Sequence, residues 1–474
     1  MTMPLADDTN SRLAACERPL DDTEGAASPI HEPIRAYSAL QLPLFGSAPD
    51  MIDSVCHGIP ENADHQALSD TRSSLTTVDL FCGAGGLTEG FRQAGFTCLY
   101  GNDCMGEAIA TFRHNHPRAW GDGRDIRLID PSEVRTSLGI ARGALDVLVG
   151  GPPCQGFSIN APERFLEDPR NELFLDYIRF VDAFQPRALL FENVPGLLSL
   201  GDGRVLDLML ASLNQAGYET SVRILFAPHY GVPQERWRLI VLGSRHGVLQ
   251  HPEPTHYAVG RANFRGGRSL TYQCSALGPF NLKPCVSVGE ALSGLPRLQM
   301  GEGAEEVHYS LEPMSEYARS MRNPDGSTYN HYASRLSAQN VARMQYVKPG
   351  GSWRDIPHDL LPKGMQRART SDHTKRYGRL TADGLACTVL TKCDPHWGAV
   401  FLPDQDRALT VREAARLQSF PDAYRFLGPR VAQYEQVGNA VPVLMARALA
   451  LSIRAHLVEA QPFQFSDALV AHAE

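Results

Sequence analysis

This 474-residue chain has no long apolar run, and no stretch approaches the roughly 20 apolar residues of a membrane span. Residues 1–8 are acidic and lack the basic and apolar regions of a signal peptide. Internal repeats are also missing. We therefore expect a soluble, cytoplasmic protein with no membrane partner.

Cysteines are few for a chain of this length: the 10 that occur are scattered, and none form a Cys-x-x-Cys pair. A disulfide scaffold is therefore excluded. Cys387, Cys393 and His396 come nearest to a zinc cluster, but their spacing is poor and no fourth ligand is evident. The sequence predicts no metal site.

The chain also lacks the positive net charge that is common among nucleic-acid-binding proteins. Its net charge of −8 arises in residues 1–75, which hold 12 acidic and 4 basic side chains, while the other 41 acidic and 41 basic side chains cancel. Residues 339–379 nevertheless contain nine Lys or Arg against three Asp. Because a local basic surface matters more than total charge, this stretch indicates phosphate contact. The alternative is a solvated loop rich in arginine.

Apolar strands and helical segments alternate from Thr76 onward. The predicted strands are 78–81, 97–101, 145–149, 188–191, 221–227 and 239–244. The predicted helices are 86–94, 106–115, 172–183, 205–216, 410–418 and 442–456. Such alternation predicts an α/β fold with a doubly wound, mostly parallel sheet.

Two regions depart from this alternation. Residues 1–75 are rich in Asp, Ser, Ala and Pro with little periodicity, which predicts a mostly disordered tail. Between about 250 and 400 the sequence is rich in Gly, Pro, Tyr, His and Arg with few long helical periods, which predicts a separate, loop-rich lobe.

The segment Gly151–Ser158 reads Gly-Pro-Pro-Cys-Gln-Gly-Phe-Ser and directly follows a predicted buried strand. Cys154 thus lies just past the C-terminal end of a strand, where open α/β sheets place their ligands. The two prolines restrict the backbone before it, and the glycine and serine suit a mobile loop after it. From these residues alone Cys154 is either an activated nucleophile or a buried structural cysteine.

Three further segments predict a nucleotide-like pocket. Asp79–Gly86 is a glycine-rich turn between the first strand and the first helix, where the backbone can approach a ligand closely. Asp103 follows the second strand, where a carboxylate can bind ribose hydroxyls. Asp125 and Ile126 could hold an adenine. The two adjacent glycines that close the turn favour S-adenosylmethionine over a dinucleotide.

Glu192 ends the next predicted strand, so it should share a sheet edge with Cys154. It is a candidate acid, although a lone glutamate at a strand end is more often simply solvated. Arg236 and Arg238 alternate at the start of a strand and therefore share one face. They could bind an anion, orient a base or hold Glu192, and a structural ion pair is the alternative for Arg236.

In their order along the chain, these motifs resemble those of the DNA (cytosine-5)-methyltransferases of bacterial restriction-modification systems. The resemblance runs from about Thr76 to Ala450. It also includes Asn171–Phe174, Leu409–Asp422, Gln436–Val441 and, within the loop-rich lobe, Leu385–Val389. It implies the sheet of S-adenosylmethionine-dependent methyltransferases with an inserted target-recognition domain.

The implied boundaries are a tail at 1–75, a catalytic domain at 76–248, a target-recognition domain at 249–402, a C-terminal part at 403–460 that completes the catalytic domain, and a tail at 461–474. The loop from Ser158 to Asn171 would close over a cytosine that has been flipped out of the duplex.

The resemblance also implies roles for individual residues. Cys154 would add to C6 of cytosine, Glu192 would contact N3 and the exocyclic amine, and Arg238, supported by Arg236, would hold the base. The residues implied to bind S-adenosylmethionine are Phe81, Gly83, Gly85, Gly86, Asp103, Asp125, Ile126, Leu173, Asn439 and Ala440. Those implied to contact DNA are Gln155, Ser158, Gln234, Arg367, Arg369, Arg376 and Thr388.

The expected partner is double-stranded DNA, bound by a monomer that acts alongside a restriction endonuclease for the same sequence. One alternative is a cytosine-5 methyltransferase of transfer RNA, which the long variable lobe disfavours. Another is a non-catalytic DNA-binding protein with this fold, which the presence of both Cys154 and Glu192 disfavours. Methylation of an exocyclic amine is disfavoured because a cysteine follows the two prolines.

Overall fold

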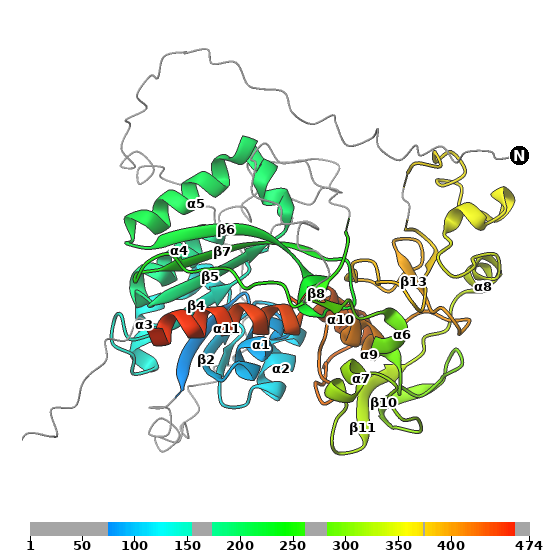
Figure 1. Cartoon of the computed structure of the whole chain (residues 1–474), viewed down its shortest axis with the longest axis horizontal. Coiled ribbons are helices and arrows are strands. Elements are labelled where there is room, and N and C mark those ends of the chain that lie inside the picture. The colour runs from blue at the N-terminus through cyan, green and yellow to red at the C-terminus, as the bar shows by residue number, and fades with distance from the viewer. Residues whose placement is uncertain (1–73, 154–172, 261–281, 373–374, 460–474) are drawn as a thin grey trace, which may run out of the picture. The chain divides into compact units, whose positions relative to one another are not determined.

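Seven strands form one sheet in the order β3-β2-β1-β4-β5-β7-β6 (Figure 1). Neighbouring strands from β3 to β5 are parallel, whereas β7 runs antiparallel to both β5 and β6. The strands are β1 Leu75–Leu80, β2 Phe96–Asn102, β3 Trp120–Asp122, β4 Val147–Gly150, β5 Ala188–Asn193, β6 Glu219–Phe226 and β7 Trp237–Ser244. The coordinates are a computed structural model, and they describe residues 74–153, 173–260, 282–372 and 375–459.

Helices cover both faces of this sheet. One face packs against α3, α4 and α5 around Leu80, Leu148 and Phe191, and the other packs against α1 and α11 around Val149 and Leu190. Strand β4 is apolar along its whole length because both of its faces are buried. The helices are α1 Gly86–Gln93, α2 Gly106–Asn115, α3 Pro131–Ser137, α4 Leu173–Phe184, α5 Arg204–Gln215 and α11 Val443–Glu459.

Between β7 and α11 the described chain forms short elements around its own apolar clusters. The strands there are β8 His256–Tyr257, β9 Lys283–Pro284, β10 Gly303–His308, β11 Ser327–Tyr332, β12 Gly378–Arg379 and β13 Ala399–Phe401. The helices are α6 Val288–Leu292, α7 Glu316–Met321, α8 Ala338–Met344, α9 Val411–Leu417 and α10 Arg430–Asn439. Ser287 and Thr410 start α6 and α9 through capping boxes with Glu290 and Glu413.

The predicted doubly wound, mostly parallel sheet is confirmed. The predicted helix at 106–115 has the bounds of α2, and every other predicted strand and helix is present with shifted bounds. The first strand ends at Leu80 rather than Phe81, because Phe81 adopts a left-handed φ of 57° and cannot continue the ladder. Strand β3 and helices α3 and α10 were not predicted. Helix α3 carried a readable start signal, since the Asp130 side chain caps it and Pro131 occupies its first turn.

The C-terminal helical stretch Arg430–Glu459 is long and apolar enough to cross a membrane by length and composition alone. In this fold it is interrupted at residues 440–442, and the apolar face of α11 lies in the core against α1. Burial inside the protein therefore accounts for its apolar character.

A carboxylate lies in the core just before the turn between β1 and α1. Asp79 is fully buried in β1, and its Oδ2 atom accepts a hydrogen bond of 2.6 Å from the Thr88 hydroxyl of α1. Among the residues that the structure describes, its Oδ1 atom has no hydrogen-bond partner. Burial raises the pKa of Asp79 from 3.8 to about 7, although Thr88 opposes the increase.

We predict that Asp79→Asn changes the pH dependence of stability. In the unfolded chain Asp79 loses its proton near pH 3.8, whereas in the folded protein it keeps the proton until about pH 7. Between these two pH values the unfolded chain is therefore favoured increasingly as pH rises, and the free energy of unfolding falls. Asp79→Asn has no carboxyl group to titrate and lacks this fall in the free energy of unfolding. The free energy of unfolding of the variant minus that of the parent should therefore rise by on the order of 4 kcal/mol from pH 4 to pH 8. Denaturant unfolding at several pH values measures the difference.

Thr88→Val provides the companion variant, because it removes the Thr88 hydroxyl that donates to Asp79 and keeps the Asp79 carboxyl group. Its stability should fall more steeply with pH than that of the parent. A difference between parent and Asp79→Asn that stays constant with pH would contradict the prediction.

Candidate functional site

The turn from β1 into α1 has a backbone conformation that requires its glycines. Gly83 and Gly85 have φ values of 54° and 94°, and Gly85 is the N-cap of α1. A Cβ added at Gly85 would lie 2.7 Å from the Tyr424 hydroxyl, whereas one added at Gly83 would meet no described atom within 4 Å. The turn is therefore closed on one side and open on the side of Gly83, next to the N-terminus of α1.

Asp103 is bound to this turn. Its Oδ2 atom accepts a hydrogen bond of 2.9 Å from the Gly83 amide, and its Oδ1 atom accepts one of 2.8 Å from the Met105 amide. Burial raises the pKa of Asp103, and these two amides oppose the increase. The second strand thus brings its carboxylate to the glycine-rich turn, as its place after that strand predicted.

The other predicted cofactor residues lie in different surroundings. Asp125 caps a short helical turn, and an ion pair of 2.5 Å with Arg127 lowers the pKa of its carboxyl group. Ile126 is buried, and Leu173 is half-buried at the start of α4. Asn439 is exposed at the end of α10, while Ala440 lies against Gly86, whose added Cβ would be 3.2 Å from that of Ala440.

Glu192 and Arg238 form a buried ion pair where β5 ends and β7 begins, with Arg238 Nε 2.5 Å from Glu192 Oε1. Burial raises the pKa of Glu192, while Arg238 and Arg236 oppose the increase. A carboxyl group in this setting can hold a proton more readily than one in water. The prediction that Arg238 could hold Glu192 agrees with this contact.

The backbone before Cys154 lies directly against Glu192. A Cβ added at Gly151 would be 2.8 Å from Glu192 Oε2, so any larger residue there would displace the Glu192 carboxyl group. Asn193 Nδ2 donates a hydrogen bond of 3.2 Å to Pro152 O. Sequence reasoning gave Asn193 no role, although its place beside Glu192 was a usable signal. Cys154, Gln155 and Ser158 themselves lie outside the described residues.

Arg236 and Gln234 bind the inserted segment to the sheet instead of facing solvent. The Arg236 guanidinium donates to Val389 O at 3.2 Å and to Gly438 O at 2.7 Å. Gln234 is fully buried; its amide donates to Leu417 O, and its carbonyl accepts from the Val389 amide. Gln234 thus has no exposed polar side-chain atom in this structure, and its contact with DNA stays a prediction.

Thr388 is half-buried, and its hydroxyl donates a hydrogen bond of 2.6 Å to Glu235 O. This bond and the contacts of Val389 hold Thr388 and Val389 against Gln234, Glu235 and Arg236, which directly precede β7. Thr388 therefore lies next to Val389, which Arg236 contacts, and the Thr388 hydroxyl is already bonded to Glu235 O.

The basic residues of 339–379 divide into two groups. Arg367 and Arg369 are exposed, and half-buried Arg376 stacks over the Trp397 ring at 4.9 Å. Arg343 and Arg379 instead point inward and donate to backbone carbonyls such as Leu360 O and Val347 O. The stretch therefore presents fewer free cations than its sequence suggests.

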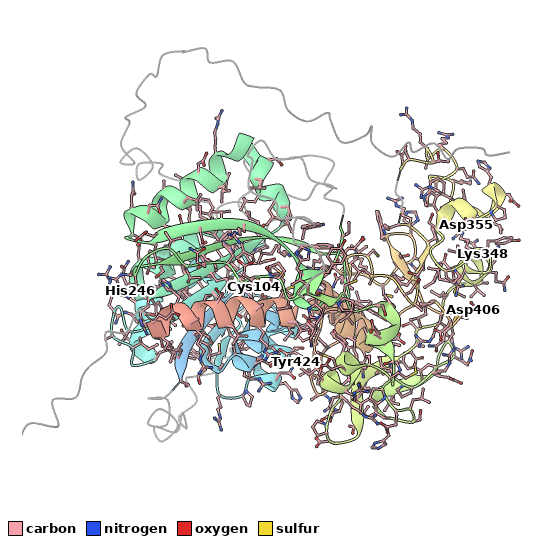
Figure 2. All side chains as sticks on the ribbon, in the orientation of Figure 1. Cys104, His246, Lys348, Asp355, Asp406 and Tyr424 are labelled. Atoms are coloured by element: carbon pink, nitrogen blue, oxygen red, sulfur yellow. The ribbon has the colours of Figure 1, made fainter. Side chains whose placement is uncertain are left out.

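Sequence reasoning also missed Tyr424, which is labelled in Figure 2. Its hydroxyl donates a hydrogen bond to Ala84 O in the glycine-rich turn. Tyr424 is separated from this turn by more than 300 residues of sequence. No local pattern could have indicated the contact.

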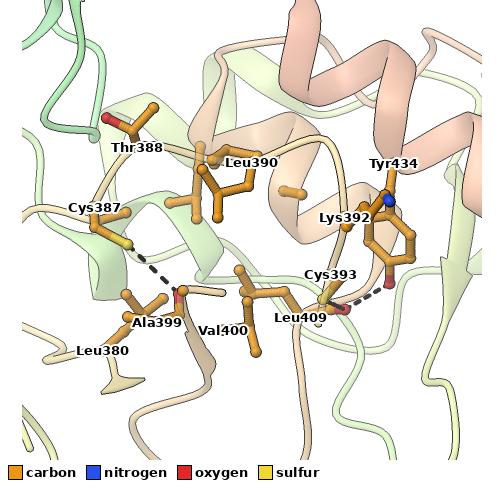
Figure 3. A pocket seen from close by; sticks show the side chains of 15 residues that line it. Leu380, Cys387, Thr388, Leu390, Lys392, Cys393, Ala399, Val400, Leu409 and Tyr434 are labelled. Carbon is orange, nitrogen blue, oxygen red and sulfur yellow. Dashed lines mark hydrogen bonds between the residues drawn. The ribbon is translucent and has the colours of Figure 1, made fainter. Parts of the chain in front are cut away.

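Thr388 and Val389 are among the residues that line an apolar pocket, which Figure 3 shows from close by. Cys387 and Cys393 border it, and their thiols donate to Ala399 O and Leu409 O. Burial raises the pKa of Cys393 to about 12, so its thiol is a poor nucleophile. The described residues contain no group of three or more His, Cys, Asp or Glu that could hold a metal ion.

The sequence profile of the family described as C-5 cytosine-specific DNA methylase matches residues 75–455. The chain is 38% identical to the type II methyltransferase M.AgeI of Thalassovita gelatinovora over 80% of this chain and 99% of that protein. It is 33% identical to M.DdeI of Desulfomicrobium norvegicum over 79% of this chain and 88% of that protein.

Mouse DNA (cytosine-5)-methyltransferase 1 is 32% identical over 84% of this chain but only 29% of its own length. Among solved structures, an E. coli protein encoded within a prophage and described as a DNA modification methyltransferase has a TM-score of 0.61. The two share 22% identity over 81% of this chain and all of that one, which supports the fold. The matches over most of the sequence show that the chain belongs to the C-5 cytosine-specific DNA methylase family.

Proposed function

We propose that this chain transfers a methyl group from S-adenosylmethionine to C5 of a flipped-out cytosine in a specific double-stranded DNA sequence. The observation that carries the proposal is the position of the Glu192–Arg238 ion pair against Gly151, at the end of the strand that leads to Cys154. This group lies at the carboxyl edge of the parallel strands, which also carries the glycine-rich turn.

The residues around the turn fit S-adenosylmethionine. Gly83 leaves open space, the N-terminus of α1 favours a carboxylate, and Asp79 Oδ1 is buried with no partner among the described residues. We propose that Phe81, Gly83, Gly85, Gly86 and Asp103 hold this group, together with Asp125, Ile126, Leu173, Asn439 and Ala440. When bound, S-adenosylmethionine supplies an electrophilic methyl group.

The Cys154 thiolate would add to C6 of cytosine, which opens the C5–C6 double bond and makes C5 nucleophilic. Glu192, whose burial favours its protonated form, would donate a hydrogen bond at N3 and contact the exocyclic amine. Arg238 would orient Glu192 and the base, with Arg236 in support. C5 would then form a bond to the donated methyl group as the methyl–sulfur bond of the donor breaks. Loss of the C5 proton to solvent water would re-form the C5–C6 double bond and expel the Cys154 thiolate.

A cysteine cannot reach C6 inside a base stack, so the target base must leave the duplex. Gln155 and Ser158 would contact the DNA around that base, while Arg367, Arg369, Arg376 and Thr388 of residues 249–402 would contact the sequence to be recognised. We further propose that the chain acts as a monomer in the cytoplasm, alongside a restriction endonuclease for the same sequence.

Cys154→Ala should abolish methylation and retain binding to duplex DNA, because it removes the nucleophile and little else. Bisulfite sequencing of DNA from cells that express the parent or the variant detects 5-methylcytosine and its sequence context. Full methylation by the variant would overturn the mechanism. Parent activity on transfer RNA, with none on duplex DNA, would overturn the proposed substrate.

Glu192→Gln should lower kcat by about 10²- to 10³-fold, since it removes the proton donor and leaves Arg238 buried without its charge partner. The control is Glu413→Gln, which breaks a buried ion pair with Arg407 outside the proposed site. Single-turnover rates should be compared at a temperature where both variants are folded. An equal loss of rate in the two variants would count against a catalytic Glu192.

Replacing Arg367 and Arg369 together by alanine should reduce the salt dependence of DNA binding. If each contacts one phosphate, the slope of log K against log salt should fall by about 2. Arg204 and Arg447, which are exposed on α5 and α11, provide a charge-matched double variant. Equal slopes for the parent and the Arg367/Arg369 variant would exclude these two residues from phosphate contact.

A further inference from the structure

Two side chains from distant parts of the sequence bind the glycine-rich turn from its closed side. The Tyr424 hydroxyl donates to Ala84 O and lies 3.0 Å from His116 Nε2. The His116 ring also lies against Gly85, because a Cβ added at Gly85 would be 2.8 Å from His116 Nε2. Tyr424 and His116 are both buried, so water does not compete for these contacts.

The proton positions in this group follow from its chemistry. Tyr424 has one hydroxyl proton, and because Ala84 O can only accept, that proton lies between them. His116 Nε2 must then carry the proton that it shares with the Tyr424 oxygen. A neutral imidazole protonated at Nε2 meets this requirement, and burial supports it by lowering the pKa of His116 to about 4.

The position of the Tyr424 hydroxyl is itself closely defined. Arg412 of α9 donates to Tyr424 O, and it also donates to Tyr329 O of β11 at 2.7 Å. The neighbouring Phe426 receives and donates hydrogen bonds of 2.9 Å with the Asn330 side chain. On the other side, the Arg425 backbone is paired with the Asn115 side chain of α2 at 2.8 and 3.0 Å.

We infer that Tyr424 and His116 are positioning residues, which hold Ala84 and Gly85 in the backbone conformation that receives the cofactor. The inference rests on the proposed function, because it assigns the turn to S-adenosylmethionine. Gly85 has a left-handed φ of 94°, and its amide donates to Cys82 O at 2.8 Å. Fixing the carbonyl of Ala84 and the backbone of Gly85 leaves the turn few other conformations, so the free protein is already arranged for binding.

Tyr424→Phe tests the inference because it keeps the ring and its packing against Phe420 and Phe426. The dissociation constant for S-adenosylmethionine, measured by calorimetry on the full chain, should rise about tenfold. At saturating S-adenosylmethionine, kcat should stay within about twofold of the parent, because the variant leaves Cys154 and Glu192 in place.

Tyr434→Phe is the matched control, because its buried hydroxyl also donates to a backbone carbonyl, Leu409 O at 2.7 Å, but not in the turn. It should lose comparable stability with no change in the dissociation constant. If Tyr424→Phe binds as the parent does, or if both variants weaken binding equally, the inference is overturned. A parent chain that binds no S-adenosylmethionine would overturn the proposed function together with the inference.

His116 offers a second variant pair should Tyr424→Phe fold poorly. His116→Leu removes the donor at Nε2 and should weaken S-adenosylmethionine binding. His116→Gln, whose amide nitrogen can take the place of Nε2, should restore much of the affinity. Equal affinities of the leucine and glutamine variants would contradict a positioning role for the hydrogen bond.

Discussion

Close contact between α1 and α11, the first and last described helices, is the constraint on which the rest of the structure depends. A Cβ at Gly90 would lie 2.4 Å from Ala446 Cβ, and one at Gly86 would lie 2.6 Å from Val441 O. Two glycines thus let α11 and the segment before it lie against α1. Because the chain returns to this contact only at its C-terminal helices, the segment after β7 forms its short elements before the chain comes back to α1.

Buried arginines hold that inserted segment in place. Arg236 joins the start of β7 to Val389 and Gly438, while Arg412 joins α9 to β11 and to Tyr424. Arg416 and Asp422 form a fully buried pair. Since a guanidinium can donate to several carbonyls at once, each of these residues connects segments whose sequences are far apart. A buried ion pair is costly to desolvate, so these contacts specify an arrangement more than they add stability.

The sequence was sufficient to predict features that depend on neighbouring strands. It did not predict contacts between segments that are far apart in the chain. Apolar strands β4 and β5 predicted the sheet, and their adjacency correctly brought Glu192 beside the backbone that leads to Cys154. Strand β3 has only three residues and so has too little periodicity to detect. The burial of Gln234 depends on Leu417 and Val389, and the role inferred for Tyr424 depends on Ala84. These contacts exist only in the folded chain.

Arginine shows why counting charges along the sequence has limited value for a protein of this kind. Arg379 and Arg367 lie in the same basic stretch, yet Arg379 donates to Val347 O and Leu402 O inside the fold while Arg367 is exposed. The difference arises because Arg379 belongs to β12, which pairs with β13 beneath an apolar cluster. Side chains on such a strand must satisfy backbone carbonyls that water cannot reach. Buried arginines therefore support the backbone of the proposed recognition domain, whereas exposed arginines of the same domain are the ones proposed to contact phosphates. The burial of each side chain decides which of the two roles it can have.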